Sequence, residues 1–237
     1  MFPQFDSKQK ITYRSRDQRN KAAAGLIQRL TKKEAKILNI GSGGEEFLKK
    51  ALPTRDVFDI DITGKADLVI DLEKVTSFDF ADNTFDVVVA LDLLEHIENL
   101  HAMLEEMLRC SDRFILISLP NPCTYFIRLL KNQTRDITDA NQRGVYEKFY
   151  GFPNSKPTDR HKWFFSIDDV RALFKHFQEH KKITHIKYFS AHKWNVRRLI
   201  LRMLCGRRLY YNLFLPNIWI LAEVDSQKLD DGGCQEI

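Results

Sequence analysis

The sequence predicts a doubly wound α/β domain, in which a largely parallel sheet carries helices on both faces. Short apolar runs rich in Ile, Val and Leu recur between residues 36 and 120, and segments with helical periodicity separate them. Runs of this kind are typical of strands that are buried on both faces of a sheet. The first run ends in the glycine cluster 41–44, which indicates a tight turn from a strand into a helix.

Each element is expected from its own local pattern. Apolar residues recur at helical spacing between Gln18 and Leu30, and Ser166 with Asp169 three residues later is a typical helix start. The predicted helices cover 18–30, 45–52, 93–108 and a segment that begins after Ser166. The predicted strands cover 37–40, 57–62, 66–72, 85–91, 114–119, 182–189 and the part of 213–224 around or after Pro216.

The chain of 1–237 is expected to form one domain. Residues 1–20 are polar and without periodicity, which predicts a mobile arm. Residues 36–120 carry the regular pattern and form the predicted ligand-binding core. Between 120 and 165 the pattern gives way to a polar, proline-containing stretch, which predicts a substrate-side insertion over the edge of the sheet that carries the ligand. Residues 166–225 are expected to complete the sheet and to include a basic helix.

Composition narrows the class of protein. With 43% hydrophobic and 29% charged residues and a net charge of +5, the chain has the profile of a globular protein. Its clean apolar runs, such as 87–91, are far below the roughly 20 residues that a membrane-spanning helix needs. The first residues, MFPQFDSKQK, lack the apolar segment of a secretory signal, so a cytoplasmic location is expected.

The cysteine pattern bears on redox and metal chemistry. Cys110, Cys123, Cys205 and Cys234 stand far apart and form no C-x-x-C pair. Neither a disulfide framework nor a structural zinc site is therefore predicted, and no metal site is expected.

The glycine turn is the first candidate binding element. Gly41, Ser42 and Gly43 lie where the backbone can approach a ligand closely, because glycine lacks a β-carbon. A dinucleotide fingerprint would have a third glycine where this sequence has Glu46, beside Glu45. Two carboxylates repel a pyrophosphate, which argues against an NAD-dependent oxidoreductase. The turn instead favours a nucleoside without phosphates, such as S-adenosylmethionine.

Acidic residues after the second and third predicted strands are the next candidates. Asp61 stands twenty residues after Gly41, where a carboxylate can accept both ribose hydroxyls. Asp59 competes for this role, but both side chains point to one face, and the one nearer the strand end is expected to reach the ribose. Asp71 is placed to accept the adenine amino group. The remaining predicted cofactor contacts are apolar: Ile62, Leu72 and Leu91.

A resemblance to a known family rests on five segments in order: ILNIGSGG, FDIDI, VIDL, FADNTFDVVVALDLLEHI and FILISLPNP. Over residues 36–120 they resemble the class I S-adenosylmethionine-dependent methyltransferases, in particular the type 11/23-like subgroup whose fourth strand leads into Leu-Glu-His. The resemblance implies a Rossmann-like sheet of seven strands with an antiparallel last strand. It also implies that S-adenosyl-L-methionine binds over the carboxyl ends of strands one to four. Asn39 departs from the pattern, since the family commonly has an acid there.

Two histidines are the candidate catalytic residues. Methyl transfer from a sulfonium is an in-line displacement, so the enzyme chiefly aligns the acceptor with the methyl group and excludes water. For a hydroxyl acceptor a general base adds about 10²- to 10⁴-fold, and His161 in DRHKWFF and His96 in LEHI are the candidates. The alternative for His96 is a bond to backbone at a helix start, and for His161 an anchoring role in its loop.

The C-terminal part of the chain is basic, with eleven Lys and Arg against one acid between 171 and 208. Within it, segment 192–208 is amphipathic. Its apolar face holds Val196, Leu199, Ile200, Met203 and Leu204, and its flanks hold Lys193, Arg197, Arg198 and Arg202. Such a helix either lies on an anionic membrane or docks its apolar face on the domain core, and docking is the preferred interpretation. No RNA or DNA module accompanies the basic stretch, so no nucleic acid partner is expected.

These observations predict a methyltransferase that acts on a small-molecule, sugar or lipid-linked acceptor at oxygen, with nitrogen as the second choice. The alternative is a catalytically silent protein of the same fold that serves as a partner or regulatory subunit. Intact Gly41, Gly43, Asp61 and Asp71 argue against that alternative.

Overall fold

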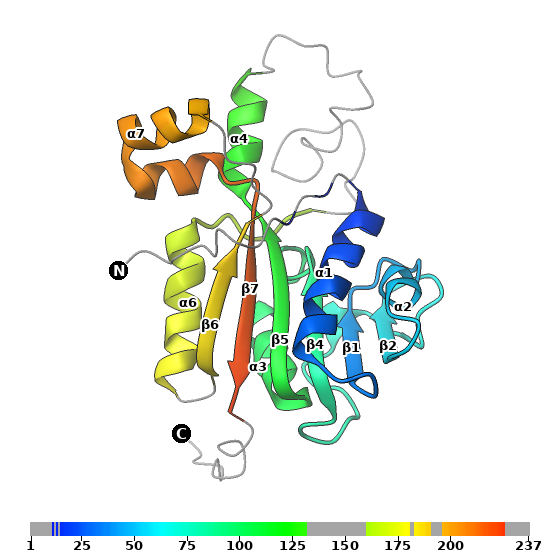
Figure 1. Cartoon of the computed structure of the whole chain (residues 1–237). Helices are drawn as coiled ribbons and strands as arrows, with labels where there is room; N and C mark the ends of the chain where they lie inside the picture. Colours follow the sequence, from blue (N-terminus) through cyan, green and yellow to red (C-terminus); the bar gives the residue numbers. More distant parts are fainter. Residues whose placement is uncertain are drawn as a thin grey trace.

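The structure, a computed structural model, describes residues 11, 13, 15–131, 160–180, 183–190 and 196–225. Within them, seven strands form one sheet in the order β3-β2-β1-β4-β5-β7-β6 (Figure 1). The strands are β1 (Lys36–Ile40), β2 (Asp56–Asp61), β3 (Leu68–Val69), β4 (Phe85–Leu91), β5 (Ser111–Pro120), β6 (Ile183–Phe189) and β7 (Asn217–Val224). β7 pairs antiparallel with β5 and β6, whereas the pairs among β1 to β5 are parallel. The expected mostly parallel sheet with an antiparallel last strand is confirmed.

Helices cover both faces and one end of this sheet (Figure 1). One face carries α1 (Arg16–Leu30) and α2 (Phe47–Ala51), and the other carries α3 (Leu100–Cys110) and α6 (Ile167–Glu179). Beyond the carboxyl end of β5, α4 (Pro122–Lys131) lies beside α7 (Val196–Phe214). Two short 3-10 turns, η1 (Leu72–Lys74) and η2 (Leu94–His96), follow β3 and β4.

Alternation along β4 explains its continuous apolar run. Val87 and Val89 pack in the core beneath α1 and α2, whereas Val88 and Ala90 pack in the core beneath α3 and α6. All four side chains are buried, so both faces of the strand are covered. This is the reason that the run lacks the polar alternation of a half-exposed strand.

The first helix begins earlier than predicted, at Arg16. Ser15 caps it, because the Ser15 hydroxyl accepts the Gln18 N–H at 3.2 Å, and Asp17 lies in the first turn. Residues 16 and 17, expected only in the mobile arm, are therefore helical, as are 18–20, where the predicted arm and helix overlap; 1–10, 12 and 14 lie outside the described residues. The S-x-x-Q pattern at 15–18 is a helix-start signal that could have been read from the sequence.

Several other predicted elements differ in length. The expected strand at 66–72 ends at Val69, because Asp71 accepts the Glu73 N–H at 3.1 Å and caps η1. The helix expected over 93–108 is divided into η2 and α3, since Ile97 between them has an extended backbone. The helix expected over 45–52 is reduced to α2, and β7 starts only after Pro216.

The predicted insertion 120–165 opens with a helix that sequence patterns did not predict, α4. Asn121 connects it to the end of α7. The Asn121 Oδ1 accepts the Cys123 N–H at 3.0 Å, and the Asn121 Nδ2 donates to the carbonyls of Asn212 and Leu215 at 2.8 and 2.7 Å. Residues 132–159 lie outside the described part of the chain.

The two ends of α7 have different surroundings. A kink at Gly206, which has a φ of 74°, separates an outer half (196–205) from an inner half (207–214). In the inner half Tyr210 and Tyr211 are buried in the core, and Asn212 accepts the Ile167 N–H at 2.8 Å. The inner half is therefore held firmly on the domain.

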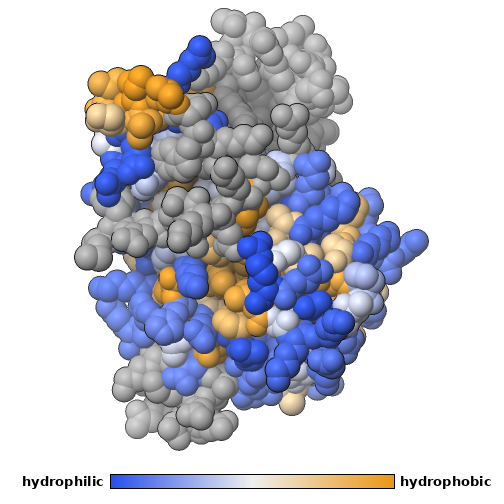
Figure 2. Space-filling model, viewed as in Figure 1, coloured by the Kyte–Doolittle hydropathy of each residue, from blue (hydrophilic) through white to orange (hydrophobic). Residues whose placement is uncertain are grey.

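The outer half of α7 corrects the preferred interpretation of segment 192–208. Its apolar face does not dock on the core; five of its side chains and Leu209 beyond the kink are 49% to 80% exposed. Leu201 and Cys205, on the opposite face, make the contacts with the core instead. Figure 2 shows the resulting apolar surface over α7 at the upper left, with hydrophilic residues beside it. Lys193 lies outside the described residues.

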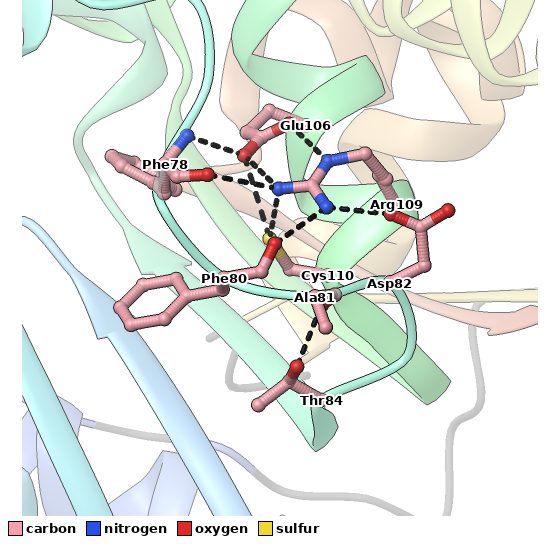
Figure 3. Close-up of polar contacts among 8 residues, drawn as sticks. All are labelled: Phe78, Phe80, Ala81, Asp82, Thr84, Glu106, Arg109 and Cys110. Atoms are coloured by element: carbon pink, nitrogen blue, oxygen red, sulfur yellow. Dashed lines mark hydrogen bonds and ion pairs between the residues drawn. The ribbon is translucent and has the colours of Figure 1, made fainter.

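A charged network fastens the chain before β4 to α3 (Figure 3). Buried Glu106 accepts the Phe78 N–H at 2.6 Å, and Arg109 donates to the carbonyl of Phe80 at 2.7 Å and to the Glu106 carboxylate at 2.6 Å. Burial opposes ionisation of Glu106, but the hydrogen bonds from Arg109 and Phe78 outweigh it and lower its pKa. The carboxylate is therefore ionised and holds the loop as an anion.

Candidate active site

A cleft of about 570 Å³ opens at the carboxyl ends of β1, β2 and β4. The strand order reverses between β1 and β4, and doubly wound sheets bind ligands at such a point. Nine of the ten predicted site residues line the cleft: Gly41, Gly43, Asp61, Ile62, Asp71, Leu72, Leu91, His96 and His161. Ser42 does not; its hydroxyl accepts the Gly44 N–H at 3.3 Å, so its part is to hold the turn.

The glycine turn forms one wall of the cleft with backbone alone. Gly41 has a φ of +75°, and a β-carbon on it would lie 2.8 Å from Leu93. Any side chain here would collide with the residue that follows β4. A β-carbon on Gly43 would lie 3.6 Å from Nη1 of Arg16, which places a guanidinium next to the turn.

Two connections of the sheet touch through their glycines. A β-carbon on Gly64, after β2, would lie 2.5 Å from the Cα of Gly44, after β1. The reverse substitution would place a β-carbon 3.1 Å from the Cα of Gly64. The loops that border the donor side of the cleft therefore meet backbone to backbone.

The carboxylates of Asp59 and Asp61 lie in different surroundings. Asp61 lines the cleft and accepts the Gly43 and Thr63 N–H groups at 2.8 and 3.0 Å, which leaves further lone pairs for a ligand. Asp59 is fully buried, accepts the Asn39 side-chain N–H at 2.7 Å, and has its pKa raised by burial. An acid at position 39, which the resemblance led us to expect, would instead place a second carboxylate beside Asp59.

The other predicted cofactor contacts line the same cleft. The pKa of the Asp71 carboxylate is lowered by the Lys74 ammonium and by the Glu73 N–H. Leu72 and Leu91 are buried, whereas Ile62 is 57% exposed within the cleft. Ile62 therefore offers uncovered apolar surface to a flat ring.

Glu95, His96 and His161 gather at another part of the cleft. The two imidazole rings lie edge to face, with centroids 4.5 Å apart. The ring centroid of Tyr125, on α4, lies 6.4 Å from that of His161. His96 Nε2 is 3.7 Å from Glu95 Oε1. Sequence reasoning named both histidines but had no reason to group them with Glu95 or Tyr125.

Segment 160–163 is fastened to η2, which explains how two distant histidines meet. The Lys162 N–H donates to the Glu95 carbonyl at 2.7 Å, and the Trp163 indole N–H donates to the Ile97 carbonyl at 2.7 Å. Lys162 also pairs with Glu73 after β3. These bonds place His161 against His96 by main-chain geometry.

Helix α1 supplies lining residues that were not predicted, Arg16 and Arg19. Arg19 pairs with Asp92, which also accepts a hydrogen bond from the Ser118 hydroxyl. The pair joins α1 to the ends of β4 and β5. The sequence could not predict the pair, because Arg19 and Asp92 lie 73 residues apart.

Comparison with known proteins agrees with this geometry. A family model described as a methyltransferase domain matches residues 14–197. The chain belongs to this methyltransferase family. The family transfers methyl groups from S-adenosylmethionine, so the protein is an S-adenosylmethionine-dependent methyltransferase. No curated protein matches the sequence of this methyltransferase.

Solved structures share its fold. The plantazolicin methyltransferase BpumL, in complex with a triazolic desmethylPZN analog and SAH, is 15% identical with a TM-score of 0.57, over 89% of this chain and 84% of BpumL. A SAM-dependent methyltransferase from Archaeoglobus fulgidus is 17% identical with a TM-score of 0.51, over 86% and 94% of the two chains. Magnesium protoporphyrin IX methyltransferase from Synechocystis PCC 6803, with bound SAH, is 15% identical with a TM-score of 0.50, over 88% and 83%. At these low identities the structural similarity shows the fold alone.

The cleft of the methyltransferase fits its donor. Gly41 and Gly43 line the cleft with backbone atoms, and Asp61 and Asp71 offer acceptors for hydroxyl and amino groups. Glu45 and Glu46 beside the turn suit a donor without phosphates.

Among the described residues, no helix is long and apolar enough to cross a membrane.

Proposed function

We propose that the methyltransferase acts on an oxygen of a small-molecule, sugar or lipid-linked acceptor. The observation that supports this proposal is the pair His96 and His161, which lines the same cleft as the donor residues. An imidazole beside the methyl group can take the proton that a hydroxyl must lose. A nitrogen acceptor is the alternative.

We assign the donor contacts as follows. Asp61 accepts the ribose hydroxyls, Asp71 accepts the adenine amino group, and Ile62 packs against the adenine ring. Arg16 is the proposed partner of the donor carboxylate, because its guanidinium lies next to Gly43. When bound, S-adenosylmethionine supplies an electrophilic methyl group, and the C–S bond breaks with its electron pair left on sulfur as the acceptor oxygen forms the new C–O bond.

At the acceptor end, the chain excludes water and positions the nucleophile. Glu95 and His161 are buried, so an acceptor hydroxyl between the cleft wall and the donor would have few water molecules around it. The proton of that hydroxyl passes to His161 or His96. Tyr125 of α4 and the neighbouring Arg160 complete the proposed acceptor wall.

Calorimetric titration tests the donor assignment. We expect S-adenosylmethionine and S-adenosylhomocysteine to bind and NAD not to bind, with Asp61→Ala weakening both by about tenfold or more, as for the loss of hydrogen bonds to a charged group. Asp56→Ala, an exposed acid at the other end of β2, is the matched control and leaves both affinities unchanged. Binding of NAD, or equal affinities in Asp61→Ala, would contradict the assignment. Donor binding without transfer to any acceptor hydroxyl would favour the catalytically silent alternative.

We further propose that the outer half of α7 binds an anionic lipid surface, and that the enzyme reaches its acceptor there. Its exposed apolar face carries Leu199, Ile200 and Met203, and Arg197 is exposed beside it. Apolar side chains that enter a lipid interface, flanked by arginines that meet anionic headgroups, are the features of interfacial helices. Phe126 and Leu130 of neighbouring α4 extend the exposed apolar surface.

Vesicle sedimentation tests this docking surface. We expect binding to vesicles that contain phosphatidylserine at low salt, and loss of binding in Leu199→Glu/Met203→Glu. Arg197→Glu/Arg198→Glu should weaken binding by about tenfold or more, since each basic residue near an anionic surface contributes about 1 kcal/mol. The matched control is Val69→Glu, which changes an equally exposed apolar residue on β3. A failure to sediment, or a dimer that Leu199→Glu/Met203→Glu dissociates, would reject the lipid surface.

The compartment is a further part of the proposal. We place the methyltransferase in the cytoplasm, and the free thiols of Cys110, Cys123 and Cys205 support this because reduced cysteines are typical there.

A further inference from the structure

Glu95, His96 and His161 form a cluster of three potential metal ligands. Methyl transfer to a hydroxyl needs at most one of them, as a general base. One carboxylate oxygen and two imidazole nitrogens, one from each residue, all lie within 4.8 Å of one another. We propose that this cluster binds a divalent transition-metal ion, with zinc as the first choice, at the acceptor end of the cleft.

Burial distinguishes this cluster from the acidic groups that are common on protein surfaces. Glu95 and His161 are 1% and 2% exposed, and the His96 side chain is 18% exposed. Placing a carboxylate in such surroundings is costly unless cationic or hydrogen-bonding groups compensate for the lost water. An ion among the three side chains would place a positive charge directly beside this buried carboxylate.

The ligand types select the ion. Two imidazole nitrogens and one carboxylate oxygen form the protein ligand set of many catalytic zinc sites, which keep a fourth position for water or substrate. Magnesium and calcium prefer sites made of oxygen atoms alone, so they are expected to bind weakly. The general order of affinities places cobalt above manganese and copper above zinc, so zinc is the first choice because of the ligand types and the tetrahedral geometry, not because of the highest affinity.

The main chain around the cluster is fixed, so binding needs only side-chain movement. Atoms that share a zinc ion at about 2.0–2.2 Å lie about 3–4 Å apart, and His96 Nε2 and Glu95 Oε1 are already 3.7 Å apart. The Lys162 N–H bond to the Glu95 carbonyl holds the backbone beside His161. Rotation of the His161 and Glu95 side chains would bring the remaining atoms within reach.

The role of the ion rests on the proposed function. An acceptor hydroxyl in the fourth position would be polarised by the ion and would lose its proton to solvent, leaving its lone pair for the methyl carbon. The two imidazoles would then be ligands instead of bases. The site would also select acceptors whose hydroxyl can reach the ion.

Metal binding is measured on the full chain after dialysis against a chelator. We expect one zinc ion per chain by calorimetric titration, and a visible absorption spectrum of the cobalt form typical of mixed nitrogen and oxygen ligands. His161→Ala and Glu95→Gln should weaken zinc binding by more than about tenfold. His161→Gln keeps most of the side-chain volume, and S-adenosylhomocysteine affinity shows that each variant is folded.

A second histidine pair requires its own control. His176 and His180 lie one turn apart at the end of α6, with ring centroids 4.1 Å apart, and could chelate zinc on the surface. All titrations are therefore repeated in His180→Ala, in which the proposed site is intact. His185→Ala, an exposed histidine on β6, is a further control.

The outcomes separate the metal site from the methyl transfer. Zinc binding that persists in His161→Ala, that disappears in His180→Ala, or that is absent would overturn the metal site. If the chelated enzyme still methylates its acceptor at an unchanged rate, the role of the ion is wrong while the proposed function stands. If S-adenosylhomocysteine does not bind, the proposed function fails, and the zinc titration still decides the metal site.

Discussion

In the donor half of the cleft every predicted contact comes from residues 41–91, whereas the acceptor half combines η2, α4 and segment 160–163. The predicted donor contacts lie at the ends of neighbouring strands. The Asp61 carboxylate accepts hydrogen bonds from the N–H of Thr63, two residues away, and from the N–H of Gly43, 18 residues away after the neighbouring strand β1. His161, in contrast, is placed by bonds that segment 160–163 makes to Glu95 and Ile97. The proposed donor half is thus built from the turns after neighbouring strands, whereas the proposed acceptor half is built from hydrogen bonds between segments far apart in sequence.

The largest expected effect is the loss of donor binding in a variant of the glycine turn. Gly41→Val places a side chain against Leu93 at a positive φ, so S-adenosylhomocysteine binding should fall below detection in calorimetry. Gly25→Ala in α1 is the matched control, because its β-carbon would meet its nearest atom at 4.0 Å, and it should bind as the wild type does. Retained binding by Gly41→Val would show that the donor does not approach this wall.

The next substitution separates the two halves. His161→Ala should lower kcat by about 10²- to 10⁴-fold, as expected for loss of acceptor activation, with the Kd of S-adenosylmethionine unchanged. Steady-state kinetics and calorimetry on the same preparation measure both quantities. Unchanged turnover would assign His161 to loop anchoring alone.

A third change tests the network that joins the chain before β4 to α3, away from the cleft. Arg109→Ala removes the cation that neutralises buried Glu106, and should lower the free energy of unfolding by about 3 kcal/mol in chemical denaturation. Arg113→Ala, whose guanidinium lies over the ring of Phe114, should cost no more than about 1 kcal/mol. Equal losses in both variants would mean that the network of Figure 3 contributes little stability.

The same network predicts an acid limit to stability. The folded-state pKa of Glu106 is lowered, so its contribution is present above the unfolded pKa and is lost as the pH falls through the folded value. Unfolding free energies measured from neutral to acidic pH should therefore decline, and Arg109→Ala should show a shallower decline. A decline of the same slope in both proteins would exclude Glu106 as its source.

The smallest expected effect is a change in acceptor KM when one hydrogen bond of segment 160–163 is removed. Trp163→Phe removes the indole N–H that donates to the Ile97 carbonyl, worth about 1 kcal/mol. We expect a KM for the acceptor that rises by several-fold, while the Kd of S-adenosylmethionine stays constant. A change in donor affinity instead would mean that the two halves are not independent.

The difference between the halves also explains what the sequence could predict. Asp61, Asp71 and the glycine turn were predictable because strand ends and turns are specified by nearby residues. Arg16 was missed although Ser15 and Gln18 carry a helix-start signal. The contact between His96 and His161 depends on bonds between segments far apart in sequence, which no local pattern encodes.

The orientation of α7 could not be derived from its periodicity. The outer half has apolar residues on two faces, Leu201 and Cys205 on one and Leu199 and Met203 on the other. Periodicity cannot tell which face meets the core when both are apolar. The kink at Gly206 and the burial of the inner half decide it.

The contact between Gly44 and Gly64 fixes how closely the loops after β1 and β2 approach each other beside the cleft. A β-carbon would lie 2.5 Å from the opposite Cα at Gly64 and 3.1 Å from it at Gly44. A substitution in one loop therefore affects which residues the other loop can accept. In a library that randomises both positions, selection for donor binding should return glycine at the two sites together. The close approach of these two loops thus depends on the absence of both side chains.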